Sequence, residues 1–132
     1  MLESAVIESD FMQAKQLQQK ILSEIDKYDY DQCAVFAIRL AMEEALNNAI
    51  RHGNAGDPSK KVEVEYEVSP EKVMIQITDE GVGFIPEKVP DPTADENLEK
   101  PSGRGIMLIH AYMDEVEYLK RGNCVRMVKL NQ

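Results

Sequence analysis

Residues 62–78 contain an alternation of apolar and charged side chains that restricts the fold more than any other feature of the chain. Valine or tyrosine occupies each even-numbered position from 62 to 68, and glutamate occupies the positions between them. A period of two is typical of a β-strand with one buried and one solvated face. The turn sequence SPEK separates this segment from the apolar run VMIQIT at residues 73–78. Together the two segments predict an antiparallel hairpin.

A short strand and two helices are predicted before this hairpin. The apolar pair at residues 6–7 indicates the strand, and Asp10 after it is a good N-cap. Apolar side chains then recur at helical spacing over residues 11–27. A longer helical pattern covers residues 31–52 and is stopped by Gly53.

The last third of the sequence predicts a loop, a helix and two strands. Residues 85–102 hold four of the six prolines and show no regular period, which indicates a functional loop because compact domains seldom leave such a length unstructured. GIMLIHAYM at residues 105–113 predicts a helix, and residues 116–130 predict two strands joined at residues 121–123. The order βααββ, loop, αββ predicts an α+β fold, a two-layer sandwich with helices on one face of a mostly antiparallel sheet.

Length and charge narrow the class of protein further. A chain of 132 residues is expected to form one domain over residues 1–132. Fifteen basic and 24 acidic residues give a net charge of −9, which repels nucleic acid and anionic membrane surfaces. The sequence has no apolar run near the roughly 20 residues that span a bilayer, and its first residues lack the features of a signal peptide, so a cytoplasmic protein is expected.

The cysteine content gives one further expectation. Cys33 and Cys124 are the two cysteines, one in a helical pattern and one in a strand pattern. No CxxC or Cys/His spacing typical of a metal site is present. This pattern favours two buried free thiols over a disulfide.

The segment EEALNNAIRHGN at residues 43–54 is unusually polar for a helix that must bury one face. Glu44 and Asn48 are four residues apart, as are Asn48 and His52, so they project from one face together with Arg51. Magnesium prefers oxygen ligands and is usually held by one or two protein groups plus substrate phosphates, so the Asn48 amide oxygen would suffice. Taken alone, the segment is more typical of a solvated helix face with paired polar side chains.

The segment TDEGVGF at residues 78–84 ends a predicted strand with Asp79, followed by Gly81 and Gly83. Glycine permits a ligand to approach the backbone closely, and a carboxylate can accept a hydrogen bond from an exocyclic amine. The pattern therefore fits purine binding. By itself it fits an ordinary turn as well.

The segment SGRGIMLI at residues 102–109 leads from Gly103 and Gly105 directly into a helix, with Arg104 between them. Free backbone N–H groups and the helix dipole make such a junction an anion site, and phosphate is the natural ligand. The segment is not a P-loop, because GxxxxGK[ST] is missing. Three such motifs in one small domain indicate a common pocket.

The three motifs resemble the N box and the two glycine boxes of the GHKL ATPase superfamily, which has the Bergerat ATP-binding fold. Within it the chain is most similar to the small bacterial anti-sigma-factor serine/threonine kinases. The segments EALNNA, DEGVGFIP and MDEV carry this similarity. The resemblance covers about residues 4–130, which is nearly the whole chain.

The resemblance implies a role for each site residue, with ATP and Mg²⁺ as cofactors. Glu44 would be the general base, Asn48 the magnesium ligand, and Arg51 a phosphate contact. Asp79 would accept a hydrogen bond from the adenine amino group, near the ring of His52. The other implied nucleotide contacts are Gly81, Gly83, Gly103, Arg104, Gly105 and Ile106, with residues 85–102 as the lid.

The resemblance also implies the activity and the partners. Such a kinase phosphorylates a serine of an anti-sigma-factor antagonist and sequesters a sigma factor or similar regulator, often as a homodimer. One alternative is an ATP-binding regulatory module without phosphotransfer. Another is the detached ATP-binding domain of a histidine kinase, which needs a phosphoacceptor histidine. Only His52 and His110 are present, and the helical pattern around His110 favours a packing role.

Overall fold

The computed structural model describes residues 2–81, 103–119 and 123–131, with the backbone alone at residues 103–106. Within these residues, antiparallel strands form a five-stranded sheet in the order β1-β2-β3-β5-β4. The predicted hairpin is the β2–β3 pair, in which Val64 lies opposite Ile77. The strands are β1 (Glu3–Glu8), β2 (Lys61–Val68), β3 (Lys72–Asp79), β4 (Glu115–Leu119) and β5 (Cys124–Leu130).

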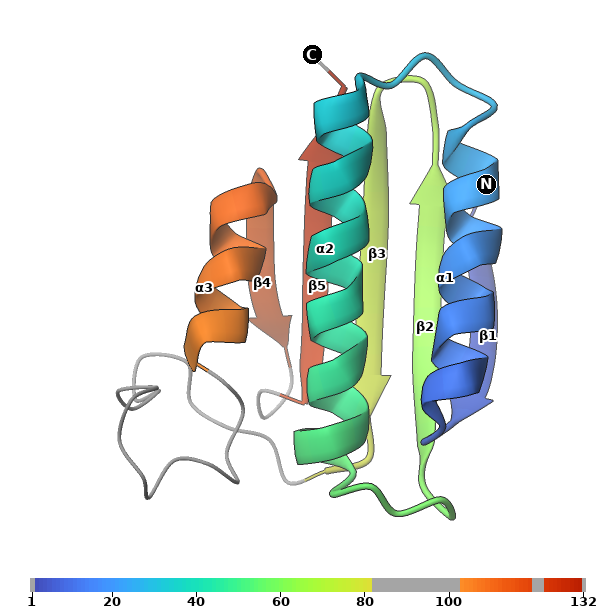
Figure 1. Ribbon diagram of the computed structural model, residues 1–132, viewed down its shortest axis with the longest axis vertical. Helices are drawn as coiled ribbons and strands as arrows, with labels where there is room; N and C mark the ends of the chain where they lie inside the picture. Colours follow the sequence, from blue (N-terminus) through green and yellow to red (C-terminus); the bar gives the residue numbers. More distant parts are fainter. Residues whose placement is uncertain (1, 82–102, 120–122, 132) are drawn as a thin grey trace.

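The helices α1 (Phe11–Ile25), α2 (Gln32–Asn48) and α3 (Gly103–Tyr112) lie on one face of this sheet (Figure 1). The predicted α+β two-layer sandwich is therefore confirmed. Burial of each large apolar side chain between the layers contributes about 1.5–3 kcal/mol to the free energy of folding, relative to leaving it exposed. In the described ranges no helix is long and apolar enough to cross a membrane. The core includes Ile21, Ile25, Ile38, Met42, Val64 and Ile75, each with at most 1% of its surface exposed.

Helix α1 begins where the sequence predicts and ends two residues earlier. The Asp10 side chain accepts a hydrogen bond from the backbone N–H of Met12 at 2.9 Å, as an N-cap does. At the other end, the backbone N–H of Lys27 bonds to the carbonyl of Glu24, three residues back, at 3.2 Å. This tighter bond closes the last turn, so the α-helix stops at Ile25.

The predicted helix over residues 31–52 is α-helical only as far as Asn48. It continues as η1 (Ala49–Gly53), a single π-helical turn. The backbone N–H of Asn54 donates to the carbonyl of Ala49, five residues back, at 2.8 Å. The prediction of one regular α-helix is therefore wrong for this last turn, because the apolar spacing of so short a segment does not distinguish four-residue from five-residue hydrogen bonding.

Both cysteines are free thiols, but only Cys124 is buried. Its sulfur accepts a hydrogen bond from the Thr78 hydroxyl at 3.1 Å. Cys33 lies exposed in the first turn of α2, which is an end of the helix open to solvent. The expectation that both thiols are buried is therefore wrong for Cys33.

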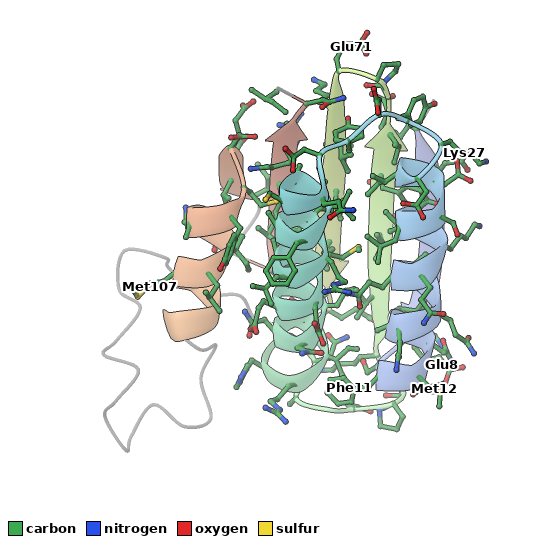
Figure 2. The ribbon with its side chains drawn as sticks, turned by 45° about the horizontal axis from the view of Figure 1, so that its top comes forward. Glu8, Phe11, Met12, Lys27, Glu71 and Met107 are labelled. Carbon is green, nitrogen blue, oxygen red and sulfur yellow. The ribbon has the colours of Figure 1, made fainter. Side chains whose placement is uncertain are left out.

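The turn between β2 and β3 lies at one end of the molecule, and the start of α1 lies at the other. Figure 2 shows Glu71, in the turn between β2 and β3, at the end opposite Phe11 and Met12. Phe11 and Met12 begin α1 and are 50% and 64% exposed. The η1 turn lies at the same end as the start of α1 (Figure 1).

Candidate functional site

Two polar segments that are far apart in the chain meet at one end of the molecule, and a third begins on the same side of the sheet (Figure 1). The η1 turn extends α2 to this end and β3 terminates there at Asp79, whereas α3 begins at Gly103 beside the lower half of α2 (Figure 1). The structure thus brings the first two sequence motifs together and places the helix of the third beside α2, within the residues that it describes. Gly83 and the predicted lid at residues 85–102 lie outside those residues.

The spacing along α2 places Glu44 and Asn48 on the side that faces α3. Toward the other end of α2, Ala37 borders a hollow of about 340 Å³ together with Ala111 and Tyr112 of α3. Residues three or four apart share one helix face, so the row 37, 41, 44, 48 continues this side of α2. Glu44 and Asn48 are both half-buried. A carboxylate and an amide therefore lie on the helix side along which α3 begins.

The η1 turn carries Arg51 and His52 at this end of the molecule. Arg51 is exposed and His52 is half-buried. Two backbone hydrogen bonds of 2.8 Å close the end of the π-turn, from the N–H of Asn54 to the carbonyl of Ala49 and from the N–H of Gly56 to the carbonyl of Ile50. Single π-turns are rare and occur frequently at functional sites.

Gly53, Asp79 and Gly81 pack against one another with no side chain between them except the Asp79 carboxylate. A Cβ on Gly53 would lie 2.6 Å from Oδ1 of Asp79, and a Cβ on Gly81 would overlap the carbonyl oxygen of Gly53. The Gly81 N–H donates to Oδ1 of Asp79 at 2.7 Å. Neither glycine has a positive φ. Both positions therefore need glycine for space and not for backbone conformation.

The Asp79 carboxyl is held rigidly and partly withdrawn from water. Burial raises its pKa above the usual 3.8, while the Gly81 hydrogen bond and the charge of Lys60 oppose the shift. Its backbone N–H donates to the carbonyl of Asn123 at 2.9 Å, and the Asn123 side-chain amide donates to the Asp79 carbonyl at 2.9 Å. A carboxylate placed in this way can accept a hydrogen bond from one defined ligand amine.

Asn54 is a buried member of this region that the sequence analysis did not identify. It has no exposed surface. Its amide nitrogen donates to the Ser9 hydroxyl at 2.9 Å and to the Lys61 carbonyl at 3.0 Å, and its oxygen accepts from the Glu80 N–H at 2.8 Å. The one available signal was its place directly after Gly53 in the polar motif, where an asparagine also fits an exposed loop.

Helix α3 provides the third part of the site. It begins at Gly103, within the glycine motif, and the first N–H groups of a helix have no partner inside the helix. Such groups bind anions readily. The structure describes residues 103–106 as backbone, so the roles expected for the Arg104 and Ile106 side chains remain predictions.

Asn48 is the residue of this site that the sequence predicts as a metal ligand. Across residues 2–81, 103–119 and 123–131, no group of three or more His, Cys, Asp or Glu side chains could hold a metal ion. One half-buried amide fits an ion that keeps most of its waters and is held mainly by substrate phosphates, as magnesium is.

This fold and site define an ATP-binding domain of known type. The chain belongs to the histidine kinase-like ATPase domain family, whose sequence profile matches residues 7–129. The resemblance inferred from the three motifs is thereby confirmed.

Individual relatives fall within the same group. The chain is 37% identical over 98 residues to the anti-sigma F factor of Oceanobacillus iheyensis, an alignment that covers 70% of this chain and 66% of the relative. It is 28% identical over 103 residues to the serine-protein kinase RsbW of Listeria monocytogenes, covering 73% of this chain and 66% of the relative. Both alignments thus span slightly less than two thirds of the relative.

A solved structure shares the fold. The RsbU and RsbW domains of Rv1364c from Mycobacterium tuberculosis match the whole of this chain with a TM-score of 0.65. The match covers 32% of that protein at 13% sequence identity. At this identity the likeness establishes the fold alone.

Proposed function

We propose that this chain is an ATP-dependent serine/threonine protein kinase, folded as one domain over residues 1–132. It phosphorylates an anti-sigma-factor antagonist and sequesters a sigma factor or a similar regulator. The observation that supports this best is the packing of the polar helix end at Gly53 against the Asp79–Gly81 turn, beside the side of α2 that faces α3. The names of the relatives, anti-sigma F factor and serine-protein kinase, support the same function.

The adenine ring is proposed to lie against the Asp79–Gly81 turn. The adenine amino group would donate to the Asp79 carboxylate, which is held in place by the Gly81 N–H at 2.7 Å. Guanine has a carbonyl at that ring position, and two acceptors facing each other repel. His52 would lie beside the ring.

The phosphates are proposed to extend from the adenine toward the start of α3. The N–H groups of residues 103–105 and the helix dipole favour a negative charge there. Arg51 and Arg104 would add positive charge. Bound magnesium, with Asn48 as its protein ligand, would neutralise part of the phosphate charge.

The transfer step needs one base in this arrangement. The substrate serine hydroxyl loses its proton to the Glu44 carboxylate as its oxygen attacks the γ-phosphorus. The bond between that phosphorus and the oxygen bridging to the β-phosphate breaks, and ADP leaves with the electron pair. Positioning and charge neutralisation supply most of the rate in such reactions.

We also expect the kinase to act in the cytoplasm and to form a homodimer. A kinase that uses ATP to control a transcription regulator acts in the cytoplasm. The resemblance to anti-sigma-factor kinases adds homodimer formation to the proposal.

The proposal is tested by isolating the partners and then assaying transfer. The chain is used to recover binding proteins from its native cells, and each recovered protein is incubated with γ-labelled ATP and magnesium. Label on a serine or threonine of one partner, together with stable binding of a second partner, is the expected result. Binding of ATP with no labelled partner would favour the regulatory module without phosphotransfer.

A further inference from the structure

The Asn54 cluster, formed by Ser9, Asn54, Lys61 and Glu80, joins three separate parts of the chain next to the candidate site. Among the residues that the structure describes, Asn54 is the one polar residue that is buried, with 0% of its surface exposed. Its nitrogen donates to the Ser9 hydroxyl and to the Lys61 carbonyl, at 2.9 and 3.0 Å. Its oxygen accepts from the Glu80 N–H at 2.8 Å. Both donor hydrogens and the acceptor are therefore used.

The cluster connects the elements that carry the site. Ser9 follows β1, Lys61 begins β2 and Glu80 follows β3, while Asn54 itself follows η1. The Ser9 hydroxyl donates onward to the Lys60 carbonyl at 2.8 Å. Among the described residues the Asn54 side chain bonds to all three segments, and the Lys61 N–H adds a direct bond to the Glu80 carboxylate.

Asparagine suits this position better than any residue of similar size. Aspartate retains the acceptor and loses both donors, leucine has neither, and serine is too short to span the same partners. An unpaired polar group in such a buried place is costly. The chemistry of the position therefore calls for two donors and one acceptor on a single short side chain.

The residues on either side of the cluster link it to the proposed adenine contact. Gly53 precedes Asn54 and packs on the Asp79 carboxylate, and Glu80 lies between Asp79 and Gly81. The bond from Glu80 to Asn54 thus holds the turn after β3 against the η1 turn. After loss of this bond the turn is still held by the Lys61 N–H, which donates to the Glu80 carboxylate, and by the bonds between Asn123 and the Asp79 backbone. The Glu80 backbone is then no longer tied to the residue after the η1 turn, so Asp79 and Gly81 can shift relative to Gly53.

We propose that Asn54 is a positioning residue that fixes Asp79 for adenine recognition. Asn54 does not contact the nucleotide and acts through the Glu80 N–H. This inference rests on the proposed function, because it takes adenine as the ligand of Asp79. The placement of Asp79 can nevertheless be measured without any nucleotide.

The first experiment measures backbone hydrogen exchange by NMR in the full chain, with Asn54→Ala as the test variant and Ser9→Ala as the matched control. Ser9→Ala removes one partner of the same side chain and leaves the Glu80 bond. The Gly81 amide is the reporter, because it bonds to Asp79 and not to Asn54. Exchange at Ile75, in the core, corrects for overall stability.

Asn54→Ala is expected to speed Gly81 exchange about tenfold or more relative to Ile75, as expected for losing a buried hydrogen bond. Ser9→Ala is expected to leave that ratio near the wild-type value. The same variants are then titrated with ATP and GTP. Asn54→Ala should lower the preference for ATP about tenfold, whereas Ser9→Ala should retain it.

Two results would overturn the inference. One is an unchanged Gly81 exchange ratio in folded Asn54→Ala, which would leave Asn54 a purely stabilising role. The other is an equal rise of Gly81 exchange in Ser9→Ala, which keeps the bond from Glu80 to Asn54 and carries the test if Asn54→Ala does not fold. A wild type that binds neither nucleotide refutes the proposed function instead, and the exchange data still decide the placement of Asp79.

Discussion

The carbonyl oxygen of Gly53 occupies the space that a Cβ on Gly81 would need. Gly53 ends the η1 turn and Gly81 follows β3, so this contact joins two of the three motifs. Bare backbone on both sides allows the Asp79 carboxylate to lie between them. The contact explains why glycine stands at both positions although neither has a positive φ.

Gly81→Ala is expected to lower both stability and ATP affinity, because the new Cβ would push the turn away from Gly53. Overpacking of this kind typically costs about 1–3 kcal/mol. Gly56→Ala is the matched control: Gly56 has a φ of +70° and no atom within 4 Å of an added Cβ. Gly56→Ala should lower the free energy of unfolding by about 1–2 kcal/mol, because alanine is disfavoured at a positive φ. It should leave the ATP affinity unchanged. Urea unfolding and calorimetric titration measure the two effects, and equal ATP affinity in Gly81→Ala and Gly56→Ala would contradict the expectation.

Glu44→Gln is expected to separate ATP binding from phosphate transfer. An amide cannot take the serine proton, so the transfer rate should fall roughly 100-fold or more while ATP affinity stays near the wild-type value. Glu43→Gln is the control, since Glu43 lies on the groove between α1 and α2 and not on the row that faces α3. A transfer assay with a recovered partner gives the rate. Transfer at the wild-type rate in Glu44→Gln would place the base elsewhere.

Asp79→Asn is expected to weaken ATP binding and to reduce the discrimination between ATP and GTP. An amide that presents its N–H₂ group can donate to the guanine carbonyl, which a carboxylate cannot do. Competition titrations with both nucleotides measure the ratio of affinities. Equal binding of ATP and GTP by the wild type would show that Asp79 does not select adenine.

The raised pKa of Asp79 predicts a pH dependence of stability. Below the usual pKa of 3.8 the group is protonated in both the folded and the unfolded chain, so it has no effect. As the pH rises above 3.8, the unfolded chain loses the proton first, and folding becomes progressively less favourable until the folded carboxyl also ionises. The wild type should therefore lose stability relative to Asp79→Asn as the pH rises through this window. Urea unfolding of both proteins at several pH values gives the difference, and a difference that is constant with pH would argue against the shift.

The elements that local sequence determines were predicted well. The hairpin of β2 and β3 follows from alternation, and the start of α1 follows from the cap at Asp10, since both depend on neighbouring residues. The residues Glu44, Asn48 and Asp79 came from spacing and motif chemistry, and their functions remain predictions. A five-stranded sheet with helices on one face follows from the order of elements.

The parts that were missed depend on contacts between distant residues. The packing of Gly53 against Asp79 and Gly81 joins residues 26 and 28 positions apart in the sequence. The burial of Asn54 depends on Ser9, which is 45 residues away. Exposure of Cys33 depends on how the start of α2 is covered. Such contacts leave no local pattern that reading the sequence could detect.

The sheet order places β5 between β3 and β4, although β5 follows β4 in the chain. During synthesis, β4 leaves the ribosome shortly before the strand that gives it a hydrogen-bonded neighbour, and β3, which is made much earlier, keeps an open edge until the same strand follows. Strand β5 therefore inserts between β3 and β4 and completes the sheet. Its pairing with β3 places Ile75 opposite Met127, which are 52 positions apart in the sequence. Because distant pairing of this kind slows folding, the β3 edge is the part of the nascent chain most in need of protection from aggregation.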